Sequence, residues 1–472
     1  MKKFLLVLVS VCLAAVIFIC GCSTNGKDGR DGIDGQNVTI EEVYKKYVDE
    51  YGEISYEEFL LKIFSYTNEE LDELTGLKSR INKSLMSGVT ILSRFGYSMK
   101  GGISILPSSY TVYNVYTGSG AILWLDKDAG DAYVVTNCHV IYDDTADSVF
   151  CNDIRLYLYG QDESGVNYKV TKNQIRDYSS YDIIDDENYC IKAEVIGASV
   201  NYDIALLKVS GSDVLKRSNA AVAEFSDDFD VTVGETVYTI GNASGEGMSS
   251  SSGIVSKDSE YITLTMSSEE EEYLSNDDYI SYRVMRITAP INHGNSGGAL
   301  YNLKGKIIGI VNAKDEDEGV DNMGYALPGK SVNMLLGLMY DNYKANGFKM
   351  KSGGGVDKAL IGITTEISDS YSRFNENTAV AEIVHQVKVN DVSSNPAKGK
   401  LEQGDYLKSA EILGSDGTVK LERFDITRDY YLREAMLSVR KGDKVKLTVE
   451  RGGQTIDLEL VFDSDKYFTH VD

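Results

Sequence analysis

Short apolar runs rich in β-branched residues, separated by Gly, Asn, Asp and Ser, dominate the chain from about residue 85 to residue 340. Runs of this length with turn-forming residues between them are typical of strands, and no long helical pattern interrupts them. The region therefore predicts an all-β barrel or sandwich, and its length fits a pair of six-stranded barrels. The clearest predicted strands are residues 121–125, 133–136, 154–159, 204–209, 237–240, 262–266 and 307–311.

The segments on either side of this region have different patterns. Residues 38–84 are rich in Glu, Lys, Tyr and Leu, with only Gly52 and Gly76 as breaks, which predicts two or three short helices. A Lys-Ser-Gly-Gly-Gly stretch at residues 351–355 predicts a hinge. Beyond it, residues 356–465 predict a small α+β domain of strands with a helix over residues 430–439.

The N-terminus has the features of an export signal. A basic start precedes an apolar stretch over residues 4–19 that is too short for a comfortable membrane span, and small residues lead to Cys22. Residues 1–22 resemble a bacterial lipoprotein signal peptide, which implies that Cys22 is lipidated and anchors the chain to the extracytoplasmic face of the bacterial cell membrane. An uncleaved anchor helix is the alternative. Glycine at every third position over residues 26–35 then predicts a flexible linker over residues 23–37.

Length and charge narrow the classes of protein to consider. With 472 residues the chain is too long for one hydrophobic core, which predicts two or more domains. The formal net charge of −25 argues against nucleic acid as a partner, because phosphates require neutralisation by Lys and Arg.

Cysteine and histidine usage gives no sign of a metal or cofactor. Of the six cysteines, Cys12 and Cys20 would be removed with the predicted signal peptide, and Cys22 is the predicted lipidation site. The other three are Cys138, Cys151 and Cys190, and a disulfide between Cys151 and Cys190 stays open because spacing alone fixes no pairing. The four histidines are scattered, so the sequence predicts no structural zinc site, no other metal and no cofactor.

Three motifs together contain the side chains that hydrolysis by a serine nucleophile requires. His139 lies in Thr-Asn-Cys-His-Val, Asp203 in Asn-Tyr-Asp-Ile-Ala-Leu-Leu and Ser296 in Gly-Asn-Ser-Gly-Gly-Ala-Leu. A serine hydroxyl is nearly inert at neutral pH, so it needs an imidazole to take its proton and a carboxylate to hold that imidazole. It also needs N–H groups to receive the oxyanion. The order His, Asp, Ser therefore predicts a base, an orienting acid and a nucleophile.

Two neighbouring residues are competing candidates for this chemistry. His293 is three residues from Ser296, which is too close along the chain to reach back easily as the base. Cys138 stands beside His139, but in an extended strand its thiol would point to the opposite face. We therefore interpret Cys138 as a small buried residue.

Five motifs occur in a fixed order along the predicted all-β region. They are Gly118-Ser119-Gly120-Ala121, Val134-Val135-Thr136-Asn137-Cys138-His139-Val140, Asp203-Ile204-Ala205-Leu206-Leu207-Lys208-Val209, Ile291-Asn292-His293-Gly294-Asn295-Ser296-Gly297-Gly298-Ala299-Leu300 and Gly324-Tyr325-Ala326-Leu327-Pro328. In this order they resemble the HtrA (Deg) proteases of the chymotrypsin fold. The resemblance implies a mostly β chain with a double β-barrel, trypsin-like serine protease domain over residues 85–345.

The resemblance also assigns roles to the motif residues. It makes Ser296 the nucleophile, His139 the general base and then acid, and Asp203 the residue that orients His139. The backbone N–H groups of Gly294 and Ser296 would form the oxyanion hole. His293 occupies a position where the family usually has proline, so the loop before the serine is expected to differ slightly.

The C-terminal segment resembles a single PDZ domain over residues 356–465. A PDZ domain binds an extended C-terminal peptide as an added strand, and loop amides hold the peptide carboxylate. By this resemblance Leu360, Ile361, Gly362 and Ile363 would supply those amides.

Together these resemblances imply a membrane-anchored, extracytoplasmic serine endopeptidase of HtrA type. Its expected partners are unfolded or damaged exported polypeptides, C-terminal peptides held by the PDZ domain, and the membrane through the lipid anchor. A homotrimer is suggested by the resemblance alone. Two alternatives stay open: an inactive binding module with a scaffold or chaperone function, and a protease that processes one specific partner.

Overall fold

The computed structural model describes residues 40–64, 68–103, 106–161, 190–227, 231–265, 279–314, 323–351, 353–376 and 378–472. The predicted signal peptide, Cys22 and the predicted linker over residues 23–37 lie outside these ranges. The chain divides into two compact units, Met1–Lys78 and Ser79–Asp472. No helix within the described ranges is long and apolar enough to cross a membrane.

Three helices form the described N-terminal segment, as the sequence predicted: α2 (Ile40–Tyr51), α3 (Tyr56–Phe64) and α4 (Asn68–Leu85). Phe59 is fully buried, and the rings of Tyr44 and Tyr47 lie against it with centroids 5.2 and 5.3 Å away. A helix pair needs such an apolar contact because short isolated helices are marginal in water. The end of α4 belongs to the second unit, where Ser84 hydrogen-bonds to Tyr238 at 3.0 Å.

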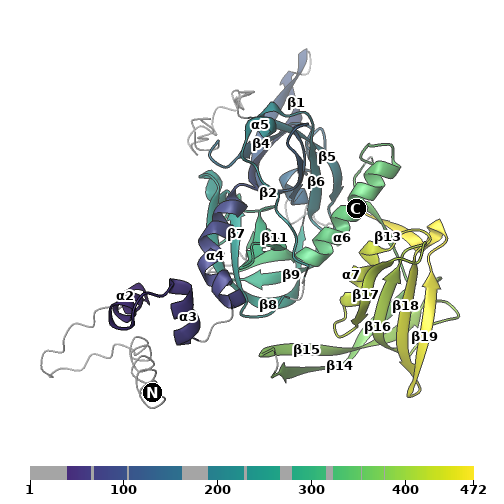
Figure 1. Ribbon diagram of the computed structural model, residues 1–472. Helices are drawn as coiled ribbons and strands as arrows, with labels where there is room; N and C mark the ends of the chain where they lie inside the picture. The colour runs from purple at the N-terminus through teal and green to yellow at the C-terminus, as the bar shows by residue number, and fades with distance from the viewer. Residues whose placement is uncertain are drawn as a thin grey trace, which may run out of the picture. The chain divides into compact units, whose positions relative to one another are not determined.

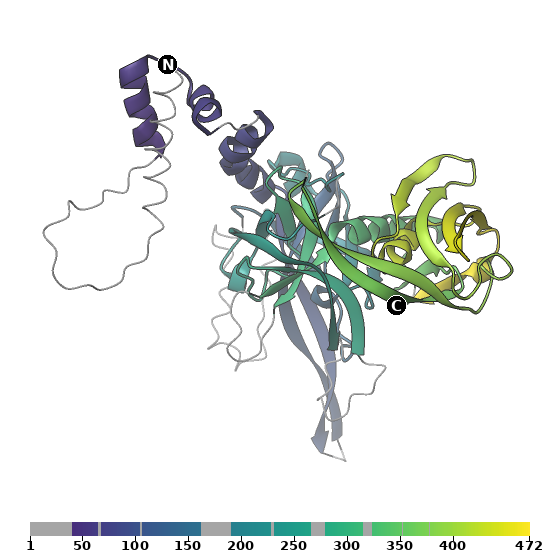
Figure 2. The same ribbon diagram turned by 90° about the horizontal axis from the view of Figure 1, so that it is seen from below.

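Two closed antiparallel barrels make up most of the second unit, which confirms the predicted double-barrel fold (Figure 1). The first barrel has the strand order β1-β2-β3-β6-β5-β4 and encloses a core that includes Ile91, Ile122 and Leu207. Its strands are β1 (Gly88–Ile103), β2 (Leu106–Asp126), β3 (Asp131–Thr136), β4 (Ile154–Leu158), β5 (Ile191–Ser199) and β6 (Ile204–Val209). Figure 2 shows that the β1–β2 hairpin continues well beyond the barrel as a two-stranded ribbon.

The second barrel has the strand order β10-β11-β12-β9-β8-β7. Its core includes Val237, Ile287 and Leu300, and the stacked rings of Tyr238 and Tyr301 lie 5.1 Å apart. Its strands are β7 (Thr236–Gly241), β8 (Ser249–Thr265), β9 (Tyr279–Ile287), β10 (Ala299–Asn302), β11 (Ile307–Lys314) and β12 (Gly324–Pro328).

The expectation that no long helix interrupts residues 85–340 was wrong at its C-terminal end. Helix α6 (Gly329–Ala345) follows β12 directly, and its apolar face includes buried Leu335 and Met339. Gly197 on β5 lets this helix approach the first barrel closely, because a Cβ there would lie 2.7 Å from the Met339 Cβ atom. A helix buried on one face against a barrel presents an apolar run that resembles a strand over a short window.

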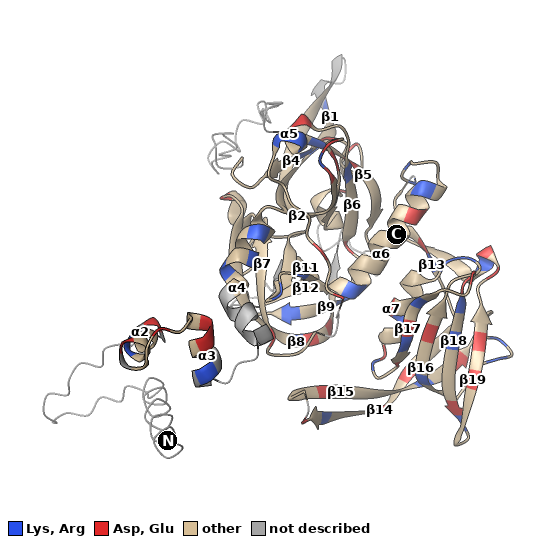
Figure 3. Ribbon diagram, viewed as in Figure 1, with Lys and Arg blue, Asp and Glu red and all other residues tan. Residues whose placement is uncertain are grey.

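The C-terminal region contains a six-stranded sheet and a two-stranded ribbon of β13 and β20. Strand β14 is at one edge of the sheet, which continues through β15, β16, β18 and β19, while β17 pairs with β16. Acidic and basic residues both occur along β16, β18 and β19, coloured red and blue on the ribbon of Figure 3. Two of their ion pairs join neighbouring strands, Lys446 with Glu411 at 3.1 Å and Lys444 with Glu459 at 3.2 Å. The elements are β13 (Val356–Ala359), β14 (Ile363–Asn375), β15 (Val380–Val392), β16 (Tyr406–Leu413), β17 (Val419–Asp425), α7 (Tyr431–Ala435), η5 (Met436–Ser438), β18 (Lys444–Arg451), β19 (Gln454–Val461) and β20 (Phe468–Val471).

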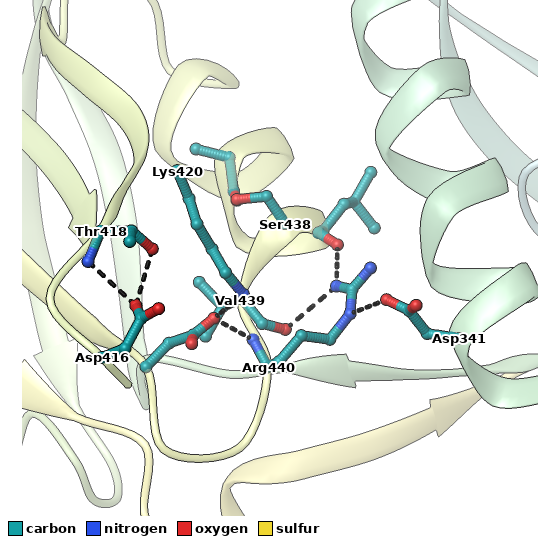
Figure 4. Close-up of polar contacts among 10 residues, drawn as sticks. Asp341, Asp416, Thr418, Lys420, Ser438, Val439 and Arg440 are labelled. Carbon is teal, nitrogen blue, oxygen red and sulfur yellow. Dashed lines mark hydrogen bonds and ion pairs between the residues drawn. The ribbon is translucent and has the colours of Figure 1, made fainter. Parts of the chain in front are cut away.

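Arg440 connects this region to helix α6 (Figure 4). Its guanidinium donates to the Asp341 carboxylate at 2.8 Å and to the Leu437 carbonyl at 2.7 Å, at the end of η5. Its backbone N–H donates to Asp443, which also accepts from Lys420. One side chain therefore satisfies the end of a helical turn and contacts the protease-side helix.

Candidate active site

The structure brings His139 and Asp203 together at the end of the first barrel. His139 lies in the short 3-10 helix η1 (Cys138–Val140) after β3, and Asp203 lies in the turn before β6. The His139 Nδ1 atom is 2.7 Å from Asp203 Oδ2, and the His139 backbone N–H donates to Oδ1 at 2.9 Å. Asp203 has φ of +47°, a left-handed conformation that Asp tolerates better than most residues. The two bonds fix both the position and the plane of the carboxylate.

Buried amide groups hold the other side of Asp203. The Asn312 side-chain amide donates to Asp203 Oδ2 at 2.5 Å, and the Asn137 amide donates to the Asp203 carbonyl at 2.8 Å. The Tyr282 hydroxyl in turn donates to Asn312 Oδ1 at 3.0 Å. Burial and the nearby Asp203 charge raise the pKa of Tyr282, so its hydroxyl remains a donor at neutral pH. The carboxylate is 1% exposed, and a buried charge of this kind is stable only when hydrogen-bonded.

The electrostatics of the pair favour a protonatable imidazole. Burial acts to lower the pKa of His139, but the charge of Asp203 and the hydrogen bond to it outweigh burial, so the pKa lies above its ordinary 6.5. The imidazole is 37% exposed, and it therefore keeps one face open to a ligand.

Ser296 lies in the loop before β10, in the second barrel. Its hydroxyl donates to the Asn312 backbone carbonyl at 3.0 Å, so Asn312 contacts Ser296 through its backbone and Asp203 through its side chain. Gly297 has φ of +84°, and a Cβ there would lie 2.2 Å from the Ser119 carbonyl. Only glycine permits this close approach of the loop to β2.

The two backbone N–H groups that the resemblance assigned to the oxyanion hole have no backbone acceptor in the described part of the chain, so they are available to donate to a ligand. Among the described residues, no backbone carbonyl accepts a hydrogen bond from Gly294 N–H or Ser296 N–H. The carbonyl of His293, in the same peptide unit as Gly294 N–H, accepts from Ser244 N–H at 2.6 Å. This bond directs the His293 carbonyl toward residue 244, and the Gly294 N–H points the opposite way because the C=O and N–H of a trans peptide are antiparallel.

The competing candidates do not fit the site. His293 is exposed, whereas Cys138 is fully buried. Cys138 lies in a 3-10 turn, so the expectation that it occupies an extended strand and points to the opposite face was wrong. Its burial, reinforced by the Asp203 charge, raises the pKa of the Cys138 thiol well above its ordinary value, which disfavours a thiolate.

The structure has no disulfide between Cys151 and Cys190. The Cys151 thiol instead donates to the carbonyls of Arg94 and Asp153, both at 3.4 Å, and burial raises its pKa to about 11. No group of three or more His, Cys, Asp or Glu side chains in the described ranges is arranged to hold a metal ion.

The sequence did not identify Asn312, Tyr282 or Ser119 as parts of this site. Asn312 is 109 positions from Asp203, and Tyr282 is 30 positions from Asn312, so no short motif contains them. Ser119 lies inside one of the five motifs, but nothing in the motif says what its hydroxyl contacts.

Comparison with known proteins supports the trypsin-like fold of the two barrels. Residues 118–310 match the family model described as "Trypsin-like peptidase domain". The "Serine protease Do-like HtrA" of Lactococcus lactis subsp. lactis (strain IL1403) is 27% identical over 353 residues, which cover 73% of this chain and 70% of the relative. The chain is a serine endopeptidase with a trypsin-like peptidase domain, and it has relatives named HtrA.

Other similarities of this trypsin-like serine protease extend over most of its length. The "Periplasmic pH-dependent serine endoprotease DegQ" of Escherichia coli (strain K12) is 28% identical over 350 residues, covering 74% of this chain and 59% of that one. The solved structure "HtrA-type protease AlgW with decapeptide" covers 82% of this chain and 97% of its own, at 19% identity and a TM-score of 0.44. Relatives of the protease are thus named as periplasmic enzymes.

The support of Asp203 by Asn312 and Tyr282 can be tested through stability. Tyr282→Phe removes a 5%-exposed side chain's hydroxyl and leaves Asn312 Oδ1 without its donor, which should lower the free energy of unfolding by about 1–3 kcal/mol. Tyr279→Phe is the matched control, because Tyr279 lies on the same strand but is 41% exposed. Urea unfolding of both variants measures the difference. Equal stability of the two variants would contradict the buried hydrogen bond.

Proposed function

We propose that this protease is an extracytoplasmic serine endopeptidase in which Ser296 is the nucleophile, His139 the general base and Asp203 the residue that orients His139. The observation that carries the proposal is the 2.7 Å imidazole–carboxylate pair, held by Asn312, whose carbonyl also contacts the Ser296 hydroxyl. Because these contacts join three motifs from two barrels, they are difficult to explain as separate surface turns.

The proposed chemistry is acyl transfer. The Ser296 hydroxyl turns from the Asn312 carbonyl to the imidazole of His139, which takes its proton as Oγ attacks the substrate carbonyl. The N–H groups of Gly294 and Ser296 then bind the oxyanion, and His139 returns the proton to the leaving amine. Water then attacks the acyl-enzyme: His139 takes a proton from the water and returns it to Ser296 Oγ as the acyl C–O bond breaks. The Asp203 carboxylate stabilises the imidazolium.

Substitution of the proposed nucleophile tests the whole proposal. Ser296→Ala should lower the rate of casein degradation by the full chain about 10⁴-fold or more, because the remaining groups cannot form an acyl-enzyme. Fluorescent casein under initial-rate conditions measures this loss, and circular dichroism checks that the variant is folded. Equal degradation by both chains would favour the inactive binding module instead.

The pKa of His139 provides an independent test. A base must be neutral, so activity should fall on acidification through a midpoint above 6.5, where the raised pKa of His139 lies. Asp203→Asn removes the charge that raises this pKa, so the His139 midpoint should move to lower pH. Histidine-selective NMR titration of the two chains measures both midpoints, with His139→Gln used for assignment. A wild-type midpoint at or below 6.5, or no shift in the variant, would be incompatible with the pair.

We further propose that residues 356–465 form a PDZ domain that binds C-terminal peptides of substrates or regulators. Strand β14 is at a sheet edge and begins at Ile363, directly after the loop of residues 360–362, which is the arrangement that strand addition requires. The Leu360 N–H already donates to the Tyr467 carbonyl at 2.8 Å. The proposed carboxylate donors are therefore the amides of Ile361 and Gly362, which have no backbone acceptor among the described residues.

A glycine substitution tests this peptide site. Gly362 has φ of +88°, and a Cβ there would lie 2.4 Å from the Ser394 carbonyl, so Gly362→Ala should displace the loop. Affinity for a fluorescent peptide with a free apolar C-terminus should fall at least about tenfold, and amidation of that peptide should have a similar effect. Gly417→Ala is the control, because Gly417 has φ of +85° but no neighbour within 4 Å of its Cβ position. Equal affinity of the two variants in fluorescence anisotropy would contradict the assignment.

Membrane attachment through Cys22, unfolded exported proteins as substrates and a homotrimer complete the proposed function. The anchor rests on the N-terminal sequence, which lies outside the described residues. The proposed extracytoplasmic location agrees with the word "periplasmic" in the name of a relative. Processing of one specific partner would use the same chemistry, and only identification of natural substrates separates that role from general quality control.

A further inference from the structure

Ser119 connects the first barrel to the loop that carries Ser296. It lies on β2, is fully buried, and its backbone N–H donates to the Ser296 carbonyl at 2.8 Å. Its hydroxyl donates to the Gly294 carbonyl at 2.6 Å and accepts from the Asn242 N–H at 2.8 Å. A single residue of one barrel therefore contacts two loops of the other.

The glycines on either side allow Ser119 to come this close. A Cβ at Gly118 would lie 2.6 Å from the Val140 side chain, and a Cβ at Gly120 would lie 2.8 Å from the Val135 carbonyl. The Ser119 carbonyl accepts from the Thr136 hydroxyl at 2.8 Å, which ties β2 to the end of β3. The Gly-Ser-Gly sequence thus places a rigid hydroxyl where the two barrels meet.

The Ser119 hydroxyl supports both peptide units around Gly294, one directly and one through a neighbouring loop. The Gly294 carbonyl is held directly by Ser119, which fixes the peptide unit after Gly294. The peptide unit before Gly294 is held by Ser244 N–H, which donates to the His293 carbonyl at 2.6 Å. Ser244 belongs to the loop that starts at Asn242, and the Asn242 N–H is bound to the same Ser119 oxygen.

The loop from Asn242 is itself under conformational constraint. Ser244 has φ of +59°, a strained value for a residue with a Cβ, and the Asn242 side chain accepts from Gly247 N–H at 2.8 Å. A Cβ at Gly294 would lie 2.2 Å from the Asn242 carbonyl, so the two loops are in close contact. Loss of one support would let the strained residue relax and the His293 carbonyl rotate.

We propose that the Ser119 hydroxyl is a positioning group that keeps the Gly294 N–H directed into the oxyanion hole. Only a group that donates and accepts at once can serve both the Gly294 carbonyl and the Asn242 N–H, and a serine hydroxyl does so in a small volume. The inference rests on the proposed function of Gly294 and Ser296 as oxyanion donors. It adds a residue that contacts neither substrate nor the reacting atoms.

The test compares two buried serines in the full chain. Ser119→Ala removes the bridging hydroxyl, whereas Ser87→Ala removes a buried hydroxyl that contacts the Ser84 carbonyl and Tyr301, away from the nucleophile loop. Both should shift the urea midpoint in the same direction. Only Ser119→Ala should lower kcat on a peptide p-nitroanilide, by about 10- to 100-fold with KM little changed, since loss of a direct oxyanion donor costs more.

A transition-state analogue separates positioning from a general loss of stability. A peptidyl trifluoromethyl ketone forms an oxyanion on addition of Ser296, so its affinity should fall in Ser119→Ala by about the same factor as kcat/KM. Unchanged kcat and unchanged analogue affinity in folded Ser119→Ala, or equal losses in Ser87→Ala, would overturn the inference. Should Ser119→Ala not fold, Ser119→Cys, whose thiol is only a weak donor and a weak acceptor, replaces it with the same expectation.

The outcome for Ser119 is distinguishable from failure of the proposed function. An active wild type with an inactive Ser296→Ala variant supports the function whatever Ser119→Ala does. An inactive wild type would remove the basis for both proposals.

Discussion

Hydrogen bonds that cross from the first barrel to the second hold the two halves of the site together. His139 and Asp203 follow strands of the first barrel, whereas Ser296 and Asn312 belong to the second. The Asn312 amide reaches Asp203 across this boundary, and Ser119 reaches the loop of Ser296 in the opposite direction. Because a misplacement of about 1 Å can cost a hundredfold in rate, the proposed chemistry would depend on these few bonds more than on the core of either barrel.

The same boundary explains why a buried carboxylate is tolerated. Asp203 accepts hydrogen bonds from the N–H groups of the His139 backbone, the His139 ring and the Asn312 amide, so its charge is solvated by protein donors in place of water.

The neighbouring strand β9 makes hydrogen bonds from both of its faces. Tyr282 points inward to Asn312, while the next residue, Arg283, pairs with Glu434 of α7 through two hydrogen bonds, one of 2.8 Å. One strand thus contacts both the proposed site and the C-terminal region.

Much of the fold was predictable because apolar runs mark buried strands. Each predicted strand lies, in its described part, within β2, β3, β4, β6, β7, β8 or β11, except that the strand predicted over residues 154–159 extends one residue beyond β4. Strand β9 was not predicted because Arg283 and Arg286 interrupt its apolar residues, and their charges are paired by Glu434 and Glu260 far away along the chain. Helix α6 escaped because its buried leucines follow directly on a strand. The helix predicted over residues 430–439 divides into α7 and η5.

Some residues of the candidate site could be predicted from short motifs, whereas others depend on contacts between distant parts of the chain. His139, Asp203 and Ser296 stand in short motifs whose glycines and apolar neighbours are visible along the chain. Asn312, Tyr282 and the contacts of Ser119 depend on contacts between segments up to 175 positions apart, as in the bond from Ser119 to Gly294. Such partners have no sequence pattern of their own, because a buried Asn, Tyr or Ser looks the same in a core as in a site.

The central claim is that the imidazole from one barrel activates the hydroxyl from the other. Labelling of the full chain with a biotinylated fluorophosphonate, followed by peptide mapping, tests this directly, because the reagent reacts only with an activated serine. The account predicts one label per chain, on Ser296, and labelling that is slower by orders of magnitude in folded His139→Ala. An unlabelled wild type, a label on another residue, or equal labelling of His139→Ala would contradict it.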